Sequence, residues 1–188
     1  MAHHEYHSQT QPCFTITDMP LRVAEPEDAM AVARVHVRSW QAAYRGLMPD
    51  DYLDQLRPED RAQRYTFGNP DPLLPFTIVA VESGEICGFA MTAPARDADM
   101  PGYGELCALY IDPDRWGCGI GKSLVAAARS HLLDQGFRHS LLWVLVGNAR
   151  AERFYRADGW SPDGARRTES IWGLTVEDIR YRRDLGQL

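Results

Sequence analysis

The chain has 188 residues, 45% of them hydrophobic and 24% charged, which suits one domain with a full core. Its 20 basic and 26 acidic residues give a net charge of −6, which argues against nucleic acid as a partner because nucleic acid requires a basic patch. No apolar run approaches the roughly 20 residues of a membrane span, so we expect no membrane partner.

The first residues are polar and contain His3, His4 and His7, without the apolar core of a signal peptide. We predict a flexible leader over residues 1–12, with adventitious metal binding by its histidines as the alternative, and a single domain over residues 13–188. The cysteines show no C-x-x-C pair and no metal-ligand spacing, which predicts free thiols in a reducing cytoplasm and no bound metal: Cys13, Cys87, Cys107 and Cys118.

The first half of the chain reads as a strand, three helices, a loop and a hairpin, over residues 21–24, 26–46, 49–56, 58–67, 68–75 and 76–93. Pro26, Pro49 and Pro58 each precede acidic residues, an arrangement typical of the first turn of a helix. Ser83-Gly84-Glu85 separates two apolar runs and predicts the turn of the hairpin.

The second half alternates strands and helices. After a polar loop we expect a strand at 105–111, a Gly-rich turn, a long helix stopped by Gly136, a strand at 141–146 and a short helix from Asn148 to Gly159. Asn148 suits an N-cap, and Gly159 suits a left-handed residue after the helix. The stretch from Trp160 to Gly173 reads as irregular, with room for a short strand, and 177–184 as a closing strand.

The turn before the long helix has a glycine at every second position, at Gly117, Gly119 and Gly121. The first turn of a helix leaves backbone N–H groups unpaired, and glycine lets an anion approach them closely. We therefore predict a phosphate cradle at this turn, with a tight connecting loop as the alternative.

Two common phosphate motifs fit poorly. A Walker A loop requires a glycine where this chain has Trp116, which disfavours nucleotide hydrolysis. The dinucleotide fingerprint G-x-G-x-x-G is one residue longer than the sequence G-x-G-x-G found here.

A second motif, N-x-x-A/R-x-x-F-Y-x-x-x-G-F/W, begins at Asn148. With the Gly-rich turn and this motif together, the chain resembles the GCN5-related N-acetyltransferase (GNAT) family, strongly over 106–160 and loosely over 21–184. The family loop R/Q-x-x-G-x-G/A aligns with 116–121, where Trp116 replaces the first Arg or Gln. The resemblance implies an α/β (α+β) acyl-CoA N-acyltransferase fold, with a mixed, mostly antiparallel sheet and helices on both faces.

The resemblance also implies which residues bind acetyl-CoA. Backbone amides of the Gly-rich turn would hold its pyrophosphate, and a bulged strand would pair with its pantetheine arm and leave an N–H near Ile111 for the acetyl carbonyl. The implied residues are Leu109, Tyr110, Ile111, Trp116, Gly117, Cys118, Gly119, Ile120, Gly121, Lys122 and Asn148.

Acetyl transfer to an amine needs a base for the ammonium proton and an acid for the departing thiolate. The resemblance suggests Glu105 as the base, with a solvated strand-edge acid as the alternative, and Tyr155 as the acid, with simple packing as the alternative. Trp40 and Tyr44 lie in the implied acceptor region and could stack on a cationic group, or could be core residues.

We therefore expect a cytoplasmic N-acetyltransferase that moves an acetyl group from acetyl-CoA directly to a primary amine of a small molecule, without a metal. Two alternatives are an acyl-CoA-binding sensor without turnover and a protein N-terminal acetyltransferase. A homodimer is compatible with the sequence, which does not decide the oligomeric state.

Overall fold

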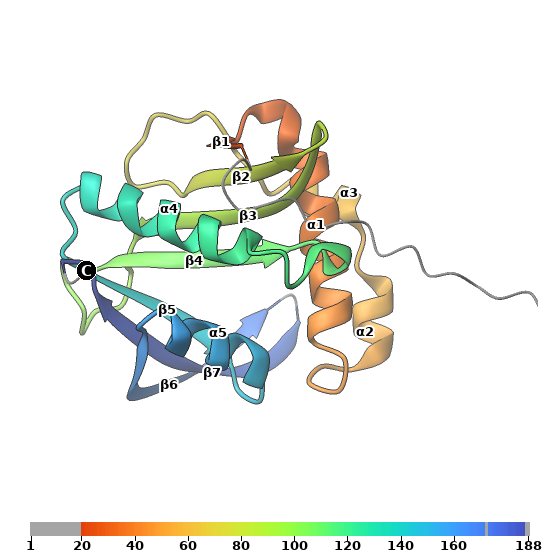
Figure 1. The fold of residues 1–188 in the computed structure, drawn as a ribbon. Coiled ribbons are helices and arrows are strands. Elements are labelled where there is room, and N and C mark those ends of the chain that lie inside the picture. The colour runs from red at the N-terminus through yellow and green to blue at the C-terminus, as the bar shows by residue number, and fades with distance from the viewer. Residues whose placement is uncertain (1–19, 172, 187–188) are drawn as a thin grey trace, which may run out of the picture.

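The structure, a computed structural model, describes residues 20–171 and 173–186. The predicted leader over 1–12 and Cys13 lie outside the described residues. Within these ranges a seven-stranded sheet has the strand order β1-β2-β3-β4-β5-β7-β6 (Figure 1). The strands are β1 Leu21–Val23, β2 Phe76–Glu82, β3 Glu85–Pro94, β4 Gly104–Ile111, β5 His139–Leu145, β6 Ser161–Ile171 and β7 Leu174–Asp184. The helices are α1 Ala29–Ala43, α2 Asp50–Gln55, α3 Pro58–Ala62, α4 Ile120–Asp134 and α5 Ala149–Ala157.

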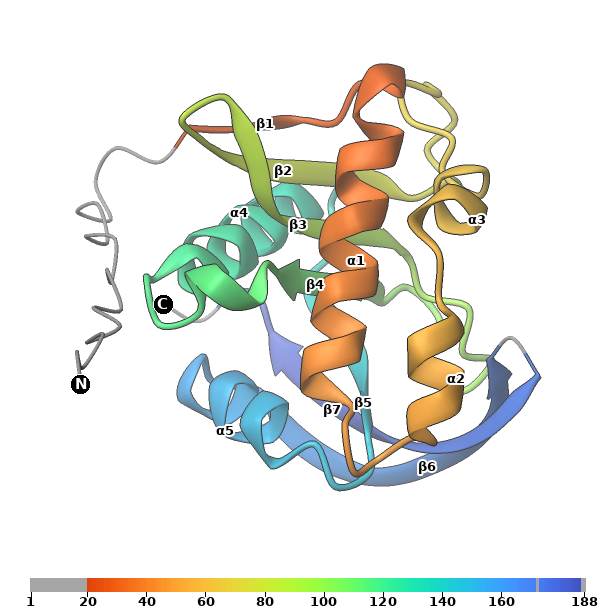
Figure 2. The same cartoon turned by 90° about the vertical axis from the view of Figure 1, so that its right-hand side faces the viewer.

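Helices cover both faces of the sheet, because α1 and α4 each carry an apolar stripe. Leu124, Val125 and Ala128 of α4 pack into a core cluster with Leu142 and Val144 of β5. Figure 2 shows α1, α2 and α3 on the opposite face from α4 and α5. The predicted layer arrangement is confirmed.

All adjacent strand pairs are antiparallel except β4 and β5, which are parallel. This pair has only two register positions, Gly104↔Ser140 and Glu105↔Leu141, although both strands continue beyond them. The register of β4 against β3 shifts so that Cys107 is an extra residue. Such a bulge bends its strand, and beyond it β4 and β5 diverge.

Three expectations from the sequence are wrong. Residues 161–171 form the long strand β6 instead of an irregular stretch, the third helix ends at Ala62, and Cys118 is disulfide-bonded, whereas Cys87 and Cys107 are free thiols. β6 is an edge strand, where proline and charged residues are tolerated. Its ion pairs from Arg166 to Glu177 and from Arg167 to Asp178 bind it to β7.

Candidate active site

A cavity of about 390 Å³ occupies the space where β4 and β5 diverge, and we call it the cleft. Its walls come from β4, β5, α1, α4, α5 and the Gly-rich turn. The cleft brings together most of the residues that the sequence suggested: Tyr44, Leu109, Tyr110, Ile111, Trp116, Gly117, Gly119, Ile120, Gly121, Lys122, Asn148 and Tyr155. Glu105, Trp40 and Cys118 do not line it.

The Gly-rich turn has the geometry of an anion cradle. Gly117 and Gly119 have φ angles of +85° and +83°, a conformation that side chains other than glycine rarely adopt, and Gly119 is the N-cap of α4. Within the described residues, the N–H groups of Gly117, Gly119, Ile120 and Gly121 have no hydrogen-bond acceptor. The positive end of α4 and these free donors favour an anion at this point.

Three side chains beside the cradle make contacts within the protein. The Trp116 indole donates a hydrogen bond to the Ile111 carbonyl at 2.9 Å, and the Arg150 guanidinium lies 3.4 Å from the centre of the Trp116 ring. Arg115, next to the cradle, forms an ion pair with Glu82. Among these side chains Arg150 offers a cation to the cleft, whereas Arg115 is held by Glu82.

The edge of β4 that faces the cleft offers backbone groups to a ligand. The Asp112 N–H donates to the Cys87 carbonyl at 2.8 Å, which sets the alternation along the β3–β4 ladder. The backbone groups of Tyr110 therefore face β3, whereas those of Leu109 and Ile111 face the cleft. The Ile111 carbonyl is already an acceptor from Ser39 Oγ at 2.6 Å.

Tyr155 and Asn148 lie on the α5 side of the cleft. Burial raises the pKa of the Tyr155 phenol well above its usual range, so its hydroxyl stays protonated at physiological pH. The side-chain oxygen of Asn148 accepts a hydrogen bond from the Ala151 N–H at 3.1 Å, which confirms the predicted helix cap.

Glu105 does not line the cleft, but in β4 it stands one position before Leu106, which does. Burial raises the pKa of Glu105, Asp97 adds to this, and Arg167 opposes it. A carboxyl with a raised pKa can exchange a proton closer to neutral pH.

Trp143 is a cleft residue that the sequence analysis missed. Its ring centre lies 4.4 Å from the Arg167 guanidinium carbon and its Nε1 lies 3.4 Å from an Asp97 carboxylate oxygen. Trp143 lies opposite Arg180 because β5 pairs with β7. In the sequence, only the apolar run 141–146 indicated that Trp143 belongs to a central strand.

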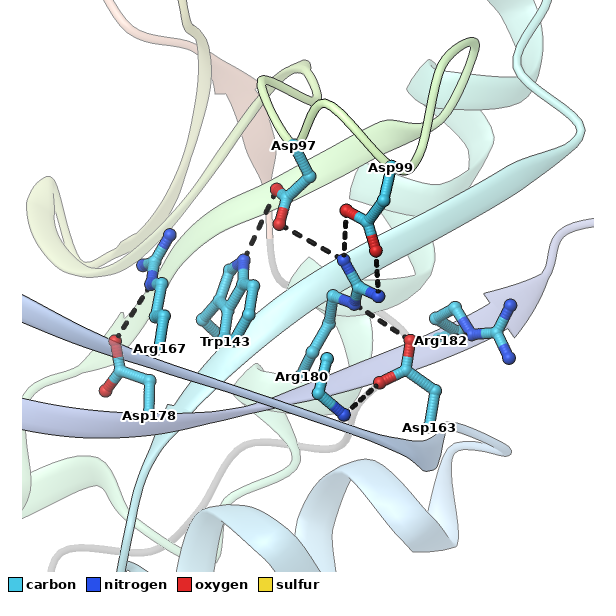
Figure 3. Close-up of polar contacts among 9 residues, drawn as sticks. Asp97, Asp99, Trp143, Asp163, Arg167, Asp178, Arg180 and Arg182 are labelled. Carbon is cyan, nitrogen blue, oxygen red and sulfur yellow. Dashed lines mark hydrogen bonds and ion pairs between the residues drawn. The ribbon is translucent and has the colours of Figure 1, made fainter.

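Arg180 fixes the surroundings of Trp143. It is 5% exposed and binds Asp97 at 3.3 Å, Asp99 at 2.7 Å and Asp163 at 2.8 Å (Figure 3). These contacts tie the loop between β3 and β4 to strands β6 and β7, next to the cleft residue Trp143.

The two aromatic residues suggested for the acceptor differ in position. Tyr44 lines the cleft, whereas Trp40 is 4% exposed and packs in a core cluster with Met48 and Leu53. The Trp40 ring meets Tyr44 edge-on with 5.0 Å between centroids. Trp40 therefore lies behind Tyr44 and supports it.

Within the described residues, no group of three or more His, Cys, Asp or Glu side chains could hold a metal ion. None of the described helices is long and apolar enough to cross a membrane.

Comparison with known proteins gives a consistent family. Residues 37–160 match the model of the acetyltransferase (GNAT) family. The uncharacterized N-acetyltransferase YuaI of Bacillus subtilis (strain 168) is 33% identical over 161 residues, which cover 85% of this chain and 89% of that protein. Mycothiol acetyltransferase of Thermobispora bispora is 34% identical over 108 residues, which cover 56% of this chain but only 32% of that protein.

Solved structures share the fold. PaiA N-acetyltransferase from Thermoplasma acidophilum, in complex with coenzyme A, has a TM-score of 0.67 at 20% identity, over 89% of this chain and 99% of that one. YncA from Salmonella typhimurium, with acetyl-CoA, has a TM-score of 0.66 at 18% identity, over 92% of this chain and 96% of that one.

Proposed function

The chain belongs to the acetyltransferase (GNAT) family, and from this premise we propose that it transfers the acetyl group of acetyl-CoA directly to a primary amine of a small molecule. The observation that carries the proposal is the cleft, which joins the free amides before α4 to the opposite face of the sheet between β4 and β5. Such a passage lets a donor and an acceptor meet from two sides, and alignment alone can lower the barrier by about 7–11 kcal/mol.

The donor would bind along the cleft. Its pyrophosphate would accept hydrogen bonds from the free amides of Gly117, Gly119, Ile120 and Gly121, with Arg150 and Lys122 close to the phosphates. Its pantetheine arm would lie beside β4 and pair with Leu109, as an added strand does. An N–H of this β4 edge would then polarise the acetyl carbonyl.

The proton transfers would use Glu105, which stands next to the cleft wall, and Tyr155, which lines the cleft. Glu105 would remove the ammonium proton of the acceptor, directly or through water, which its raised pKa supports. The amine would attack the thioester carbon, and the C–S bond would break with its electron pair leaving on sulfur. Tyr155 would donate a hydrogen bond to that thiolate.

A small-molecule acceptor is supported by the relatives named mycothiol acetyltransferases, although the chain spans only about a third of the length of the first of them. The cleft, whose volume of about 390 Å³ the acceptor would share with the donor, also suits a small ligand better than a folded protein.

The test is a panel of amines mixed with acetyl-CoA, with release of free CoA thiol as the measurement. Direct transfer predicts intersecting double-reciprocal lines when both substrates are varied, whereas an acetyl-enzyme intermediate gives parallel lines. Thermal stabilisation by CoA without acetylation of any amine would instead support a binding protein without turnover.

A further inference from the structure

The charges that line the cleft are all of one sign. Arg115, Lys122 and Arg150 line it, and no Asp or Glu of the described residues does, in a protein whose net charge is −6. Arg115 is held in its ion pair with Glu82. Two cations therefore stay available to a ligand in the cleft, Lys122 at the start of α4 and Arg150 at the start of α5.

The stability of α5 does not explain the position of Arg150. It is the second residue of that helix, and a cation in the first turn opposes the helix dipole. Burial lowers the pKa of its guanidinium, and within residues 20–171 and 173–186 no carboxylate forms an ion pair with it. A partly desolvated cation without a counter-charge is costly, and an anionic ligand in the cleft would supply the missing charge.

Trp116 holds the Arg150 side chain in place. The guanidinium carbon lies 3.4 Å from the centre of the indole ring, so the two flat groups stack. The ring is itself fixed, because its N–H donates to the Ile111 carbonyl at 2.9 Å, which also accepts from Ser39 Oγ at 2.6 Å. Stacking occupies one face of the guanidinium and leaves the N–H groups in its plane available as donors.

The stack lies beside the anion cradle. Trp116 directly precedes Gly117, whose N–H is the first of the free amides. The start of α4 also lies against α5, since a Cβ added at Gly121 would be 3.2 Å from the Phe154 ring. A cation that starts from α5 and rests on Trp116 is therefore next to the amides that favour an anion.

We propose that Arg150 binds the diphosphate of the donor and that Trp116 is a positioning residue that presents Arg150 to it. This inference rests on the proposed use of acetyl-CoA. The family loop has Arg or Gln at the position of Trp116, so this chain would replace a side chain of the loop by a guanidinium from α5. A guanidinium matches phosphate oxygens in a forked contact, and the free amides would bind the remaining oxygens. The diphosphate would thus join the start of α4 to α5, the helix that carries Tyr155.

The test is a double-mutant cycle on CoA binding, measured by isothermal titration calorimetry without any amine. Arg150→Gln should weaken CoA binding roughly tenfold or more, because charge-assisted hydrogen bonds are lost. Trp116→Leu should weaken it roughly threefold or more in the parent, and should cause no further loss when Arg150→Gln is already present. Arg153→Gln is the matched control, because it removes the same charge from an exposed position of α5 outside the cleft.

Dephospho-CoA identifies the phosphate that is bound, since it lacks the 3′-phosphate and keeps the diphosphate. Arg150→Gln should weaken its binding by the same factor as that of CoA, whereas a loss confined to CoA would overturn the diphosphate contact. Equal CoA affinity in the Arg150→Gln and Arg153→Gln variants would also overturn that contact. A loss in Trp116→Leu that persists beside Arg150→Gln would overturn the positioning role, because Trp116 would then act through the loop itself.

The readout is binding, so its result is distinct from that of the acetylation assay. CoA binding that depends on Arg150, in a protein that acetylates no amine, would refute the proposed transfer and leave this contact standing. An active enzyme whose CoA affinity is indifferent to Arg150→Gln would refute the contact alone, after melting curves establish that each variant folds. Absence of CoA binding by the parent protein would overturn both.

Discussion

Replacement of Tyr155 by phenylalanine tests the chemistry of the cleft most directly. The change removes one hydroxyl and keeps the ring that packs edge-on against Phe154 and Trp160. The raised pKa of the Tyr155 phenol lies above that of a thiol, which is near 8.5, so complete proton transfer to the leaving thiolate is uphill. Tyr155 would therefore act mainly by donating a hydrogen bond to the developing thiolate.

The size of the effect follows from that role. A hydrogen bond to a charged group contributes about 1.5–3 kcal/mol, and each 1.36 kcal/mol changes a rate tenfold. We expect Tyr155→Phe to lower kcat by roughly 10- to 150-fold. Because the phenol stays protonated, the factor should be the same at every pH from about 6 to 9.

The assay is the initial rate of thiol release from acetyl-CoA at saturating amine. Tyr181→Phe is the control, because Tyr181 is fully buried, donates to Glu152 at 2.9 Å and does not line the cleft. Its kcat should stay within about twofold, after melting curves establish that both variants fold. A Tyr155→Phe rate within twofold of the parent, or a loss confined to one end of the pH range, would refute the reasoning.

Three further predictions concern other parts of the site. Glu105→Gln should lower kcat/KM by roughly 10²-fold or more, and in the parent protein kcat/KM should fall as pH drops through the raised pKa of Glu105, because only the ionised carboxylate is a base; an unchanged pH profile in the variant would exclude Glu105 as that base. Gly119→Ala should cost about 1–2 kcal/mol of stability, since its φ is +83°, and should weaken the thermal stabilisation by acetyl-CoA. Arg180→Met should lower the free energy of unfolding by about 3 kcal/mol in urea titrations, because it removes the buried cation that binds Asp97, Asp99 and the buried Asp163, whereas Arg182→Met, at an exposed position, removes only a second contact to Asp163 and should cost less than about 1 kcal/mol; equal losses would contradict this.

Features with a local cause were predictable from the sequence. The positive φ angles of Gly117 and Gly119 follow from the absence of Cβ, and the cap at Asn148 follows from a side chain that reaches an amide three residues ahead. The Gly-rich turn before α4 and the helix α5 were therefore predicted correctly, whereas phosphate binding at that turn stays a prediction. The roles of Glu105 and Tyr155 stay predictions, since they came from the family resemblance.

Features with a distant partner were not predictable in the same way. Residues 161–171 contain Pro162, Gly164 and many charges, and they become a strand only because β7 supplies pairing and ion pairs. Trp143 belongs to the cleft because β4 turns away from β5, and Arg115 is held in an ion pair because Glu82 of β2 lies beside it. Each of these depends on contacts between residues far apart in sequence.

The divergence of β4 and β5 explains why this sheet keeps an unpaired edge at its centre. Beyond Glu105 no β5 residue pairs with β4, and buried backbone groups without partners cost about 1–3 kcal/mol each. The side chains of Ser39 and Trp116 satisfy the carbonyl of Ile111 from outside the sheet. The cleft-facing groups of Leu109 have no strand beside them, so a ligand with amide groups in an extended arm could complete the sheet there. The bulge that separates β4 from β5 thus leaves backbone N–H and C=O groups of β4 unpaired, and a ligand such as acetyl-CoA would form hydrogen bonds with them.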